Sequence, residues 1–134
     1  MCDKSPKVSV NIVAYNQENY IAECIESILF QTYGNIEILI SDDASTDNTV
    51  NIASYYAENH PEKIKILTSK KNQGMVANAT KGLKASTGDY YCSFAGDDIM
   101  LPTKVQKQVE LLEKNPHIVM CHTNAVIYDD NLKE

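Results

Sequence analysis

Apolar and polar positions alternate along the chain in a way that predicts strands and helices in turn. Short runs rich in β-branched and aromatic residues, typical of strands, occupy positions 8–14, 36–41, 64–68, 90–95 and 118–123. Between them, apolar side chains recur at helical spacing over 20–31, 46–59, 74–85 and about 102–115. Strands separated by helices of this length indicate βαβ units. We therefore expect an α/β fold with a mostly parallel sheet flanked by helices.

The helical spacing also predicts which side chains face the core. Ser45 or Thr46 is expected to cap the second helix, because a hydroxyl there can accept a hydrogen bond from a free backbone amide. The inward-facing set predicted for the third and fourth helices is Val76, Ala79, Leu83, Leu101, Val105, Val109 and Leu112.

Length and composition fit one domain over residues 1–134, since 134 residues can enclose a sizeable core and no linker interrupts the pattern. The formal net charge of −6 disfavours a nucleic-acid-binding protein, which would present a basic face. No apolar run approaches the length of a membrane span, and the first residues lack an apolar signal region. We expect a cytoplasmic protein.

Polar side chains follow three of the predicted strands at the point where each ends. Tyr15 and Asn16 come after the first strand, Asp43 after the second, and Asp97 and Asp98 after the fourth. The carboxyl ends of parallel strands meet at one edge of a sheet, and ligands of such sheets bind there. These side chains are therefore predicted to share one site.

The chemistry of these side chains is that of a nucleoside diphosphate site. The ring of Tyr15 can stack on a base, and the carboxylate of Asp43 can accept hydrogen bonds from a base N–H or from ribose hydroxyls. Asp97 and Asp98 repel each other unless a cation lies between them, and Mg²⁺ commonly binds one or two carboxylates together with substrate phosphates. A solvated acidic turn is the alternative explanation for Asp97 and Asp98.

Several motifs along the chain occur in the order and at the spacing of a known enzyme family. Together they resemble the inverting family 2 glycosyltransferases of the GT-A fold, and the resemblance runs from Lys7 to about Tyr128. The motifs are the segments 8–16 (VSVNIVAYN), 31–33 (QTY), 37–47 (EILISDDASTD), 72–74 (NQG), Gly82, and 88–98 (GDYYCSFAGDD) before Pro102.

The resemblance implies a nucleotide-sugar donor, usually a UDP- or dTDP-sugar, and Mg²⁺ or Mn²⁺ as cofactor. By position, Ala14, Tyr15 and Asn16 would border the nucleoside, and Asp43 would contact the base. Asp97 would face the ribose and share the metal with Asp98, which would hold it on the diphosphate. The product would be a glycan or cell-surface polysaccharide, formed on a glycan or lipid-linked acceptor, with the protein in the cytoplasm or at the inner membrane surface.

Two positions differ from the pattern of many family members. Ala95 stands where an acidic residue is common. Ala79-Thr80 stands where Arg-Asn is common, so these two positions of the third helix are not expected to contact the base. The segment 72–74 fits a turn and helix cap as well as a ligand contact.

The acceptor half of the family follows the acidic motif, and the chain ends at Glu134. We therefore expect the donor-binding, N-terminal portion of such an enzyme, truncated relative to the family. Asp129 and Asp130 fall too early to be assigned as the catalytic base, so the catalytic residue is unknown. Apolar surface left at the sheet edge is expected to favour self-association.

Two other functions remain open at this point. A non-catalytic nucleotide-binding or interaction module fits the length of the chain. A phospho-receiver domain is also a small α/β unit with an acidic pocket, but it carries acidic residues after its first strand, where this chain has Tyr15 and Asn16.

Overall fold

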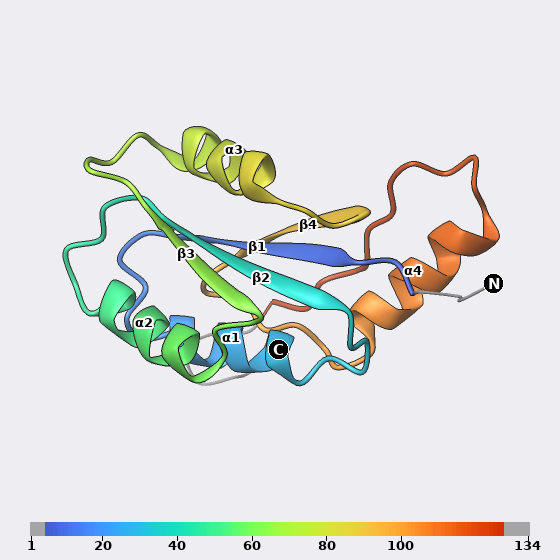
Figure 1. Ribbon diagram of the computed structural model, residues 1–134, viewed down its shortest axis with the longest axis horizontal. Helices are drawn as coiled ribbons and strands as arrows, with labels where there is room; N and C mark the ends of the chain where they lie inside the picture. Colours follow the sequence, from blue (N-terminus) through green and yellow to red (C-terminus); the bar gives the residue numbers. More distant parts are fainter. Residues whose placement is uncertain (1–4, 128–134) are drawn as a thin grey trace.

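The computed structural model describes residues 5–127 and contains eight regular elements in alternating order (Figure 1). The strands are β1 (Val8–Ala14), β2 (Ile36–Asp42), β3 (Ile64–Thr68) and β4 (Tyr90–Ala95). The helices are α1 (Ile21–Leu29), α2 (Thr49–Asn59), α3 (Met75–Ala85) and α4 (Lys104–Lys114). The order and type of these eight elements confirm the sequence prediction.

The four strands form one parallel sheet in the order β3-β2-β1-β4. Helices α1 and α2 lie on one face of the sheet and α3 lies on the other (Figure 1). In register, Val10 of β1 is opposite Ile38 of β2 and Cys92 of β4. Strands β2 and β3 therefore lie on one side of β1, and β4 lies on the other side of β1.

One face of the sheet is apolar and carries the hydrophobic core. Alternate residues of β1 point to this face, because successive side chains of a strand point to opposite sides. They pack with the buried faces of α1 and α4, including Ile25, Ile28, Val105 and Val109. The buried members from the strands are Val8, Val10, Ile12, Ala14, Ile38, Ile40 and Ile64.

The opposite face is polar and lies beneath α3. Asn11 of β1 accepts a hydrogen bond from the Ser41 hydroxyl (2.7 Å) and donates one to the Tyr91 hydroxyl (3.0 Å). A Cβ atom at Gly82 would overlap the Asn11 side chain, so only glycine allows α3 to approach this closely. Helix α3 therefore rests on a hydrogen-bonded layer instead of an apolar one.

That polar layer explains why the predicted inner face of α3 is wrong. Val76 and Leu83 are 81% and 51% exposed, whereas Asn78 and Gly82 are buried. Apolar spacing predicts the core side of a helix only when the surface beneath it is apolar. In the last helix, Val105 and Val109 are buried as predicted, but Leu101 lies before α4 and is 73% exposed.

Two further predictions about the elements are wrong. Residues 118–123 form no strand, and Val119 and Met120 are 96% and 78% exposed. An apolar run becomes a strand only by pairing with another strand, and the sheet among residues 5–127 ends at β4. Helix α2 begins at Thr49, so Ser45 and Thr46 do not cap it.

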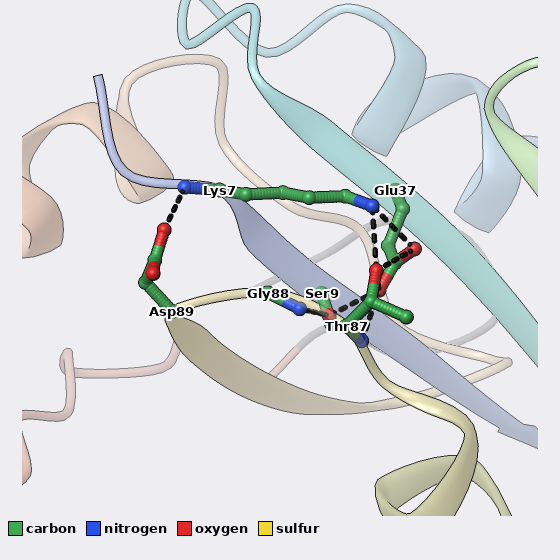
Figure 2. A network of polar contacts seen from close by, with 6 residues as sticks. All are labelled: Lys7, Ser9, Glu37, Thr87, Gly88 and Asp89. Atoms are coloured by element: carbon green, nitrogen blue, oxygen red, sulfur yellow. Dashed lines mark hydrogen bonds and ion pairs between the residues drawn. The ribbon is translucent and has the colours of Figure 1, made fainter. Parts of the chain in front are cut away.

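At the amino-terminal edge of the sheet, Glu37 of β2 is the centre of a polar network (Figure 2). Its carboxylate accepts hydrogen bonds from the Lys7 ammonium (2.8 Å), the Ser9 hydroxyl (2.5 Å) and the Thr87 amide (2.6 Å). The Ser9 hydroxyl accepts from the Gly88 amide (2.8 Å). The network therefore joins β1 and β2 to the connection between α3 and β4.

The backbone is left-handed at Asn16 (φ 51°) and Ala44 (φ 64°), which lie two residues after the ends of β1 and β2 respectively. Asn tolerates this conformation, but in Ala the Cβ atom crowds the backbone. Ala44→Gly is expected to raise the free energy of unfolding by up to about 1 kcal/mol, the relief of strain exceeding the extra entropy of the unfolded glycine.

Urea unfolding of the purified chain measures this change. The matched control is Ala77→Gly, at an exposed position inside α3, which should lower the free energy of unfolding by about 1 kcal/mol. Equal destabilisation by both substitutions would show that Ala44 carries no strain.

None of the helices described in residues 5–127 is long and apolar enough to cross a membrane. The longest of them have 11 residues.

Candidate nucleotide-sugar site

The strand ends meet at one edge of the sheet, as the sequence predicts. Ala14, the last residue of β1, is opposite Asp42 of β2, and Val13 is opposite Ala95 of β4. Apart from Ala14, which ends β1, the predicted site residues all lie in the segments that follow these strands. The structure therefore brings Tyr15 and Asn16, Asp43, and the Asp97-Asp98 pair to the same edge.

The centre of this edge lies between β1 and β4. Beyond β1 the chain adds β2 and β3 on one side, and the connection after β3 then crosses back to place β4 on the other side of β1. A crevice at such a reversal of strand order is the common ligand position in open parallel sheets. Tyr15 follows β1 and Asp97 follows β4, so these two segments border the reversal directly.

The Tyr15–Asn16 segment combines a free ring with a fixed amide. Tyr15 is 45% exposed, so part of its side chain is accessible to a ligand. The side-chain oxygen of Asn16 accepts a hydrogen bond from the backbone amide of Thr46 (2.8 Å). The backbone amide of Asn16 donates to the Ser45 hydroxyl (2.9 Å). Asn16 thus ties the loop after β1 to the loop after β2 and holds Tyr15 at the edge.

Asp43 is buried, with an exposed fraction of 2%, and it fastens the start of α3. Its carboxylate accepts hydrogen bonds from the amides of Gln73 (3.0 Å to each oxygen) and Gly74 (2.7 Å). Asn72 accepts a further bond from the Gly74 amide (3.1 Å). The 72–74 segment is therefore a turn and helix start that Asp43 holds beside the strand ends.

The Asp97-Asp98 pair lies on the surface directly after β4, and both residues are exposed. Partial burial raises the pKa of Asp98, and the neighbouring charge of Asp97 raises it further. Burial raises the pKa of the Cys24 thiol to about 12, and the charges of Asp98 and Asp97 add to the shift. The two carboxylates therefore concentrate negative charge near the first turn of α1, where Cys24 lies.

The donor set of this pair suits a cation that also takes ligands from a substrate. Within residues 5–127 there is no group of three or more His, Cys, Asp or Glu side chains that could hold a metal ion. Mg²⁺ and Mn²⁺ are hard cations, and Mg²⁺ is usually held through one or two carboxylates plus phosphate oxygens. Asp97 and Asp98 fit that mode and do not fit an all-protein cage.

Sequence reasoning missed two residues of this edge. Asn78 donates to the carbonyl oxygens of Ala14 (3.3 Å) and Ser41 (2.6 Å), and the Lys81 ammonium donates to the carbonyl of Asp42 (2.9 Å). Both residues lie on α3 at positions that helical apolar spacing assigns to solvent. A signal was available in Ser9 and Asn11, the two polar residues that alternate with apolar residues in β1 and so indicate a polar face of the sheet.

Comparison with known proteins decides the family. Residues 9–134 match the sequence profile of glycosyl transferase family 2. The chain belongs to this family. The family assignment rules out the phospho-receiver alternative.

The family's relatives are longer than this chain. It is 41% identical over 128 residues to the protein EpsE of Bacillus subtilis (strain 168), which covers 96% of this chain and 46% of EpsE. It is 34% identical over 125 residues to the uncharacterized glycosyltransferase YibD of Escherichia coli (strain K12), covering 92% of this chain and 36% of YibD. The chain therefore spans less than half the length of these two relatives.

Two solved structures share the GT-A fold of this chain. S. aureus TarS 1–349 in complex with UDP matches with a TM-score of 0.76 and 25% identity over 82% of this chain and 33% of the TarS chain. The mannosyltransferase PcManGT of Pyrobaculum calidifontis, in complex with GDP-Man and Mn²⁺, matches with a TM-score of 0.67 and 26% identity over 72% of this chain and 29% of that chain.

Proposed function

We propose that this chain binds a nucleotide sugar, with a UDP- or dTDP-sugar as the donor, for transfer to a hydroxyl group of a glycan or lipid-linked acceptor. The observation that carries the proposal is the convergence of Tyr15, Asp43 and the Asp97-Asp98 pair at the carboxyl-terminal edge of the sheet, where the strand order also reverses. TarS with UDP and PcManGT with GDP-Man support a nucleotide-bearing donor.

The donor lies along the edge with its base toward β2 and its diphosphate toward β4. Ala14, Tyr15 and Asn16 border the nucleoside, with the exposed ring of Tyr15 against the base. Asp43 holds the start of α3 next to the base, and its remaining acceptor capacity serves a base N–H. Asp97 faces the ribose.

Asp97 and Asp98 would hold Mg²⁺ or Mn²⁺, and Mn²⁺ in the PcManGT complex supports that choice. A divalent cation there would neutralise negative charge on the diphosphate as it leaves the sugar. The two carboxylates would supply the protein ligands of the metal, and a bound diphosphate would supply further oxygen ligands. Metal and nucleotide should therefore bind together more tightly than either binds alone.

Calorimetric titration of UDP into the purified chain tests the proposal. With Mn²⁺ present we expect a saturable heat of binding, and with a chelator present we expect that heat to disappear. GDP in the same titration reports which base the site accepts. Equal heats with Mn²⁺ and with chelator would contradict metal-dependent donor binding.

Transfer to an acceptor is a separate expectation. A displacement at the sugar needs a general base near the acceptor hydroxyl, a contribution of about 10²–10⁴-fold in rate. The chain offers no assigned base, and Asp129 and Asp130 lie outside the described residues. We therefore expect residues 1–134 to bind the donor without useful acceptor-dependent turnover. A measurement of that turnover distinguishes a catalytic chain from a non-catalytic nucleotide-binding module.

The measurement is release of UDP from UDP-sugars in the presence of a panel of glycan acceptors. Release that depends on the acceptor would show that a base is present within the 134 residues.

In cells we place the protein in the cytoplasm or at the inner membrane surface, where nucleotide sugars meet lipid-linked acceptors.

A further inference from the structure

Asn78, the fourth residue of α3, is a buried polar residue that the proposed donor contacts do not use. It is 2% exposed. Its side-chain nitrogen donates to two carbonyl oxygens on neighbouring strands, those of Ala14 (3.3 Å) and Ser41 (2.6 Å). Only this orientation of the side-chain amide is favourable, because exchanging its nitrogen and oxygen would place the oxygen against two carbonyl oxygens, which are acceptors as well.

These two carbonyls stand at the places where the site segments begin. Ala14 is the residue before Tyr15, and Ser41 is two residues before Asp43. The carbonyl of Ala14 also accepts a hydrogen bond from the Asp43 amide (3.1 Å). One side chain of α3 thus binds the junction from which the stacking residue and the base-side carboxylate both extend.

Asp43 makes the reverse connection, from the strand to the helix. Its carboxylate accepts from the amides of Gln73 and Gly74, while Asn78 donates from the helix to the strands. The first turn of α3 is therefore held to the strand ends at two points. The two connections run in opposite directions and add to the bond from the Lys81 ammonium to the carbonyl of Asp42.

Asn78 is also poorly explained as a residue that only stabilises the fold. Its side-chain oxygen is buried and has no hydrogen-bond partner within residues 5–127. A buried acceptor left without a partner costs about 1–3 kcal/mol. Asn11, which lies in the same polar layer, has its oxygen and its nitrogen both paired.

We propose that Asn78 is a positioning residue for the nucleoside end of the donor site: it fixes Tyr15 and Asp43 relative to each other through the carbonyls of Ala14 and Ser41. The inference rests on the proposed function. It assigns Asn78 to binding of the base and ribose and leaves binding of the metal and diphosphate to Asp97 and Asp98, which follow a different strand.

The test compares two ligands that share the diphosphate and differ in the nucleoside. Asn78→Ala is titrated with UDP and with pyrophosphate, both in the presence of Mn²⁺. We expect the affinity for UDP to fall about tenfold or more and the affinity for pyrophosphate to stay within about twofold. Asn78→Asp, which keeps the size of the side chain and lacks both donor hydrogens, should behave in the same way and serves if the alanine variant does not fold.

Asn11→Ala is the matched control, because Asn11 is an equally buried asparagine in the same layer that binds no strand-end carbonyl. It should lower the melting temperature more than Asn78→Ala does and leave the affinity for UDP within about twofold. Equal loss of UDP and pyrophosphate binding in Asn78→Ala, unchanged UDP binding, or an equal effect of Asn11→Ala would overturn the inference. Absence of UDP binding by the unaltered chain would instead refute the proposed function, and the inference with it.

Discussion

Replacing Asp98 with asparagine should weaken Mn²⁺-dependent binding of UDP by about 100-fold. The substitution keeps the shape of the side chain and removes one of the two adjacent charges. With two carboxylates as the only assigned protein ligands, the loss of one removes about half of the protein's hold on the cation. Residues that merely orient a metal ligand already change affinity by 10–100-fold, so loss of a ligand should reach at least the upper end of that range.

The experiment titrates UDP into the Asp98→Asn variant with Mn²⁺ and with chelator. Asp89→Asn is the matched control, since Asp89 is an exposed aspartate at the opposite edge whose only described bond is from the Lys7 amide (2.8 Å). An asparagine oxygen can still accept that bond. If Asp98→Asn binds UDP as tightly as the unaltered chain and keeps the response to chelator, Asp97-Asp98 is a solvated acidic turn.

Replacing Glu37 with glutamine should lower the free energy of unfolding by about 2–3 kcal/mol at neutral pH. Burial by itself raises the pKa of Glu37, but the hydrogen bonds from Lys7, Ser9 and Thr87 outweigh burial and lower the pKa from 4.5 to about 2. Hydrogen bonds to a charged group contribute about 1.5–3 kcal/mol, and one pKa unit corresponds to about 1.4 kcal/mol. Glutamine keeps one acceptor oxygen and loses the charge that makes these bonds strong.

The pH dependence follows from the direction of that shift. Because the pKa of Glu37 is lower in the folded state, its contribution to stability is complete above about pH 4.5 and is lost as the pH falls toward 2. The loss of stability in acid should therefore be shallower in Glu37→Gln than in the unaltered chain. Between pH 5 and 8 the difference between the two proteins should be constant.

Urea unfolding at several pH values measures both effects. The control is Glu58→Gln, which removes the same charge from an exposed position of α2 and should change stability by less than about 0.5 kcal/mol. The network lies at the edge opposite the donor site, so folded Glu37→Gln should bind UDP normally. A difference from the unaltered chain that grows as the pH falls below 4.5 would contradict the predicted sign.

The Glu37 network also shows why some polar residues resist interpretation from sequence. Glu37 stands in a run of β-branched and apolar residues, where its partners are far away along the chain. A side chain at Gly88 would lie 2.7 Å from the carbonyl of Lys7 and the amide of Ser9, so this close approach depends on glycine. Only the sheet brings positions 7, 9, 37 and 87 together.

The sequence by itself determined the elements and the edge at which the site lies. Alternation within strands and helical spacing between them are local properties, so β1 to β4 and α1 to α4 could be predicted within a few residues of their ends. The parallel arrangement follows from the crossover helices, and with it the meeting of Tyr15, Asp43 and the Asp97-Asp98 pair at one edge. The resemblance to family 2 glycosyltransferases follows from the same motifs and is confirmed.

Only the tertiary structure decided what lies between the elements. Whether residues 118–123 form a strand depends on a neighbouring strand with which they could pair. Which face of α3 is buried depends on the surface of the sheet beneath the helix. Both are set by parts of the chain that are distant in sequence. Asp43 was predicted from its residue type as a ligand for a base, but its burial against the 72–74 turn adds a task that no spacing along the chain reveals. Asn78 was hidden for the same physical reason: a polar residue on a helix is assigned to solvent until the surface beneath the helix is known to present carbonyls that it can bind.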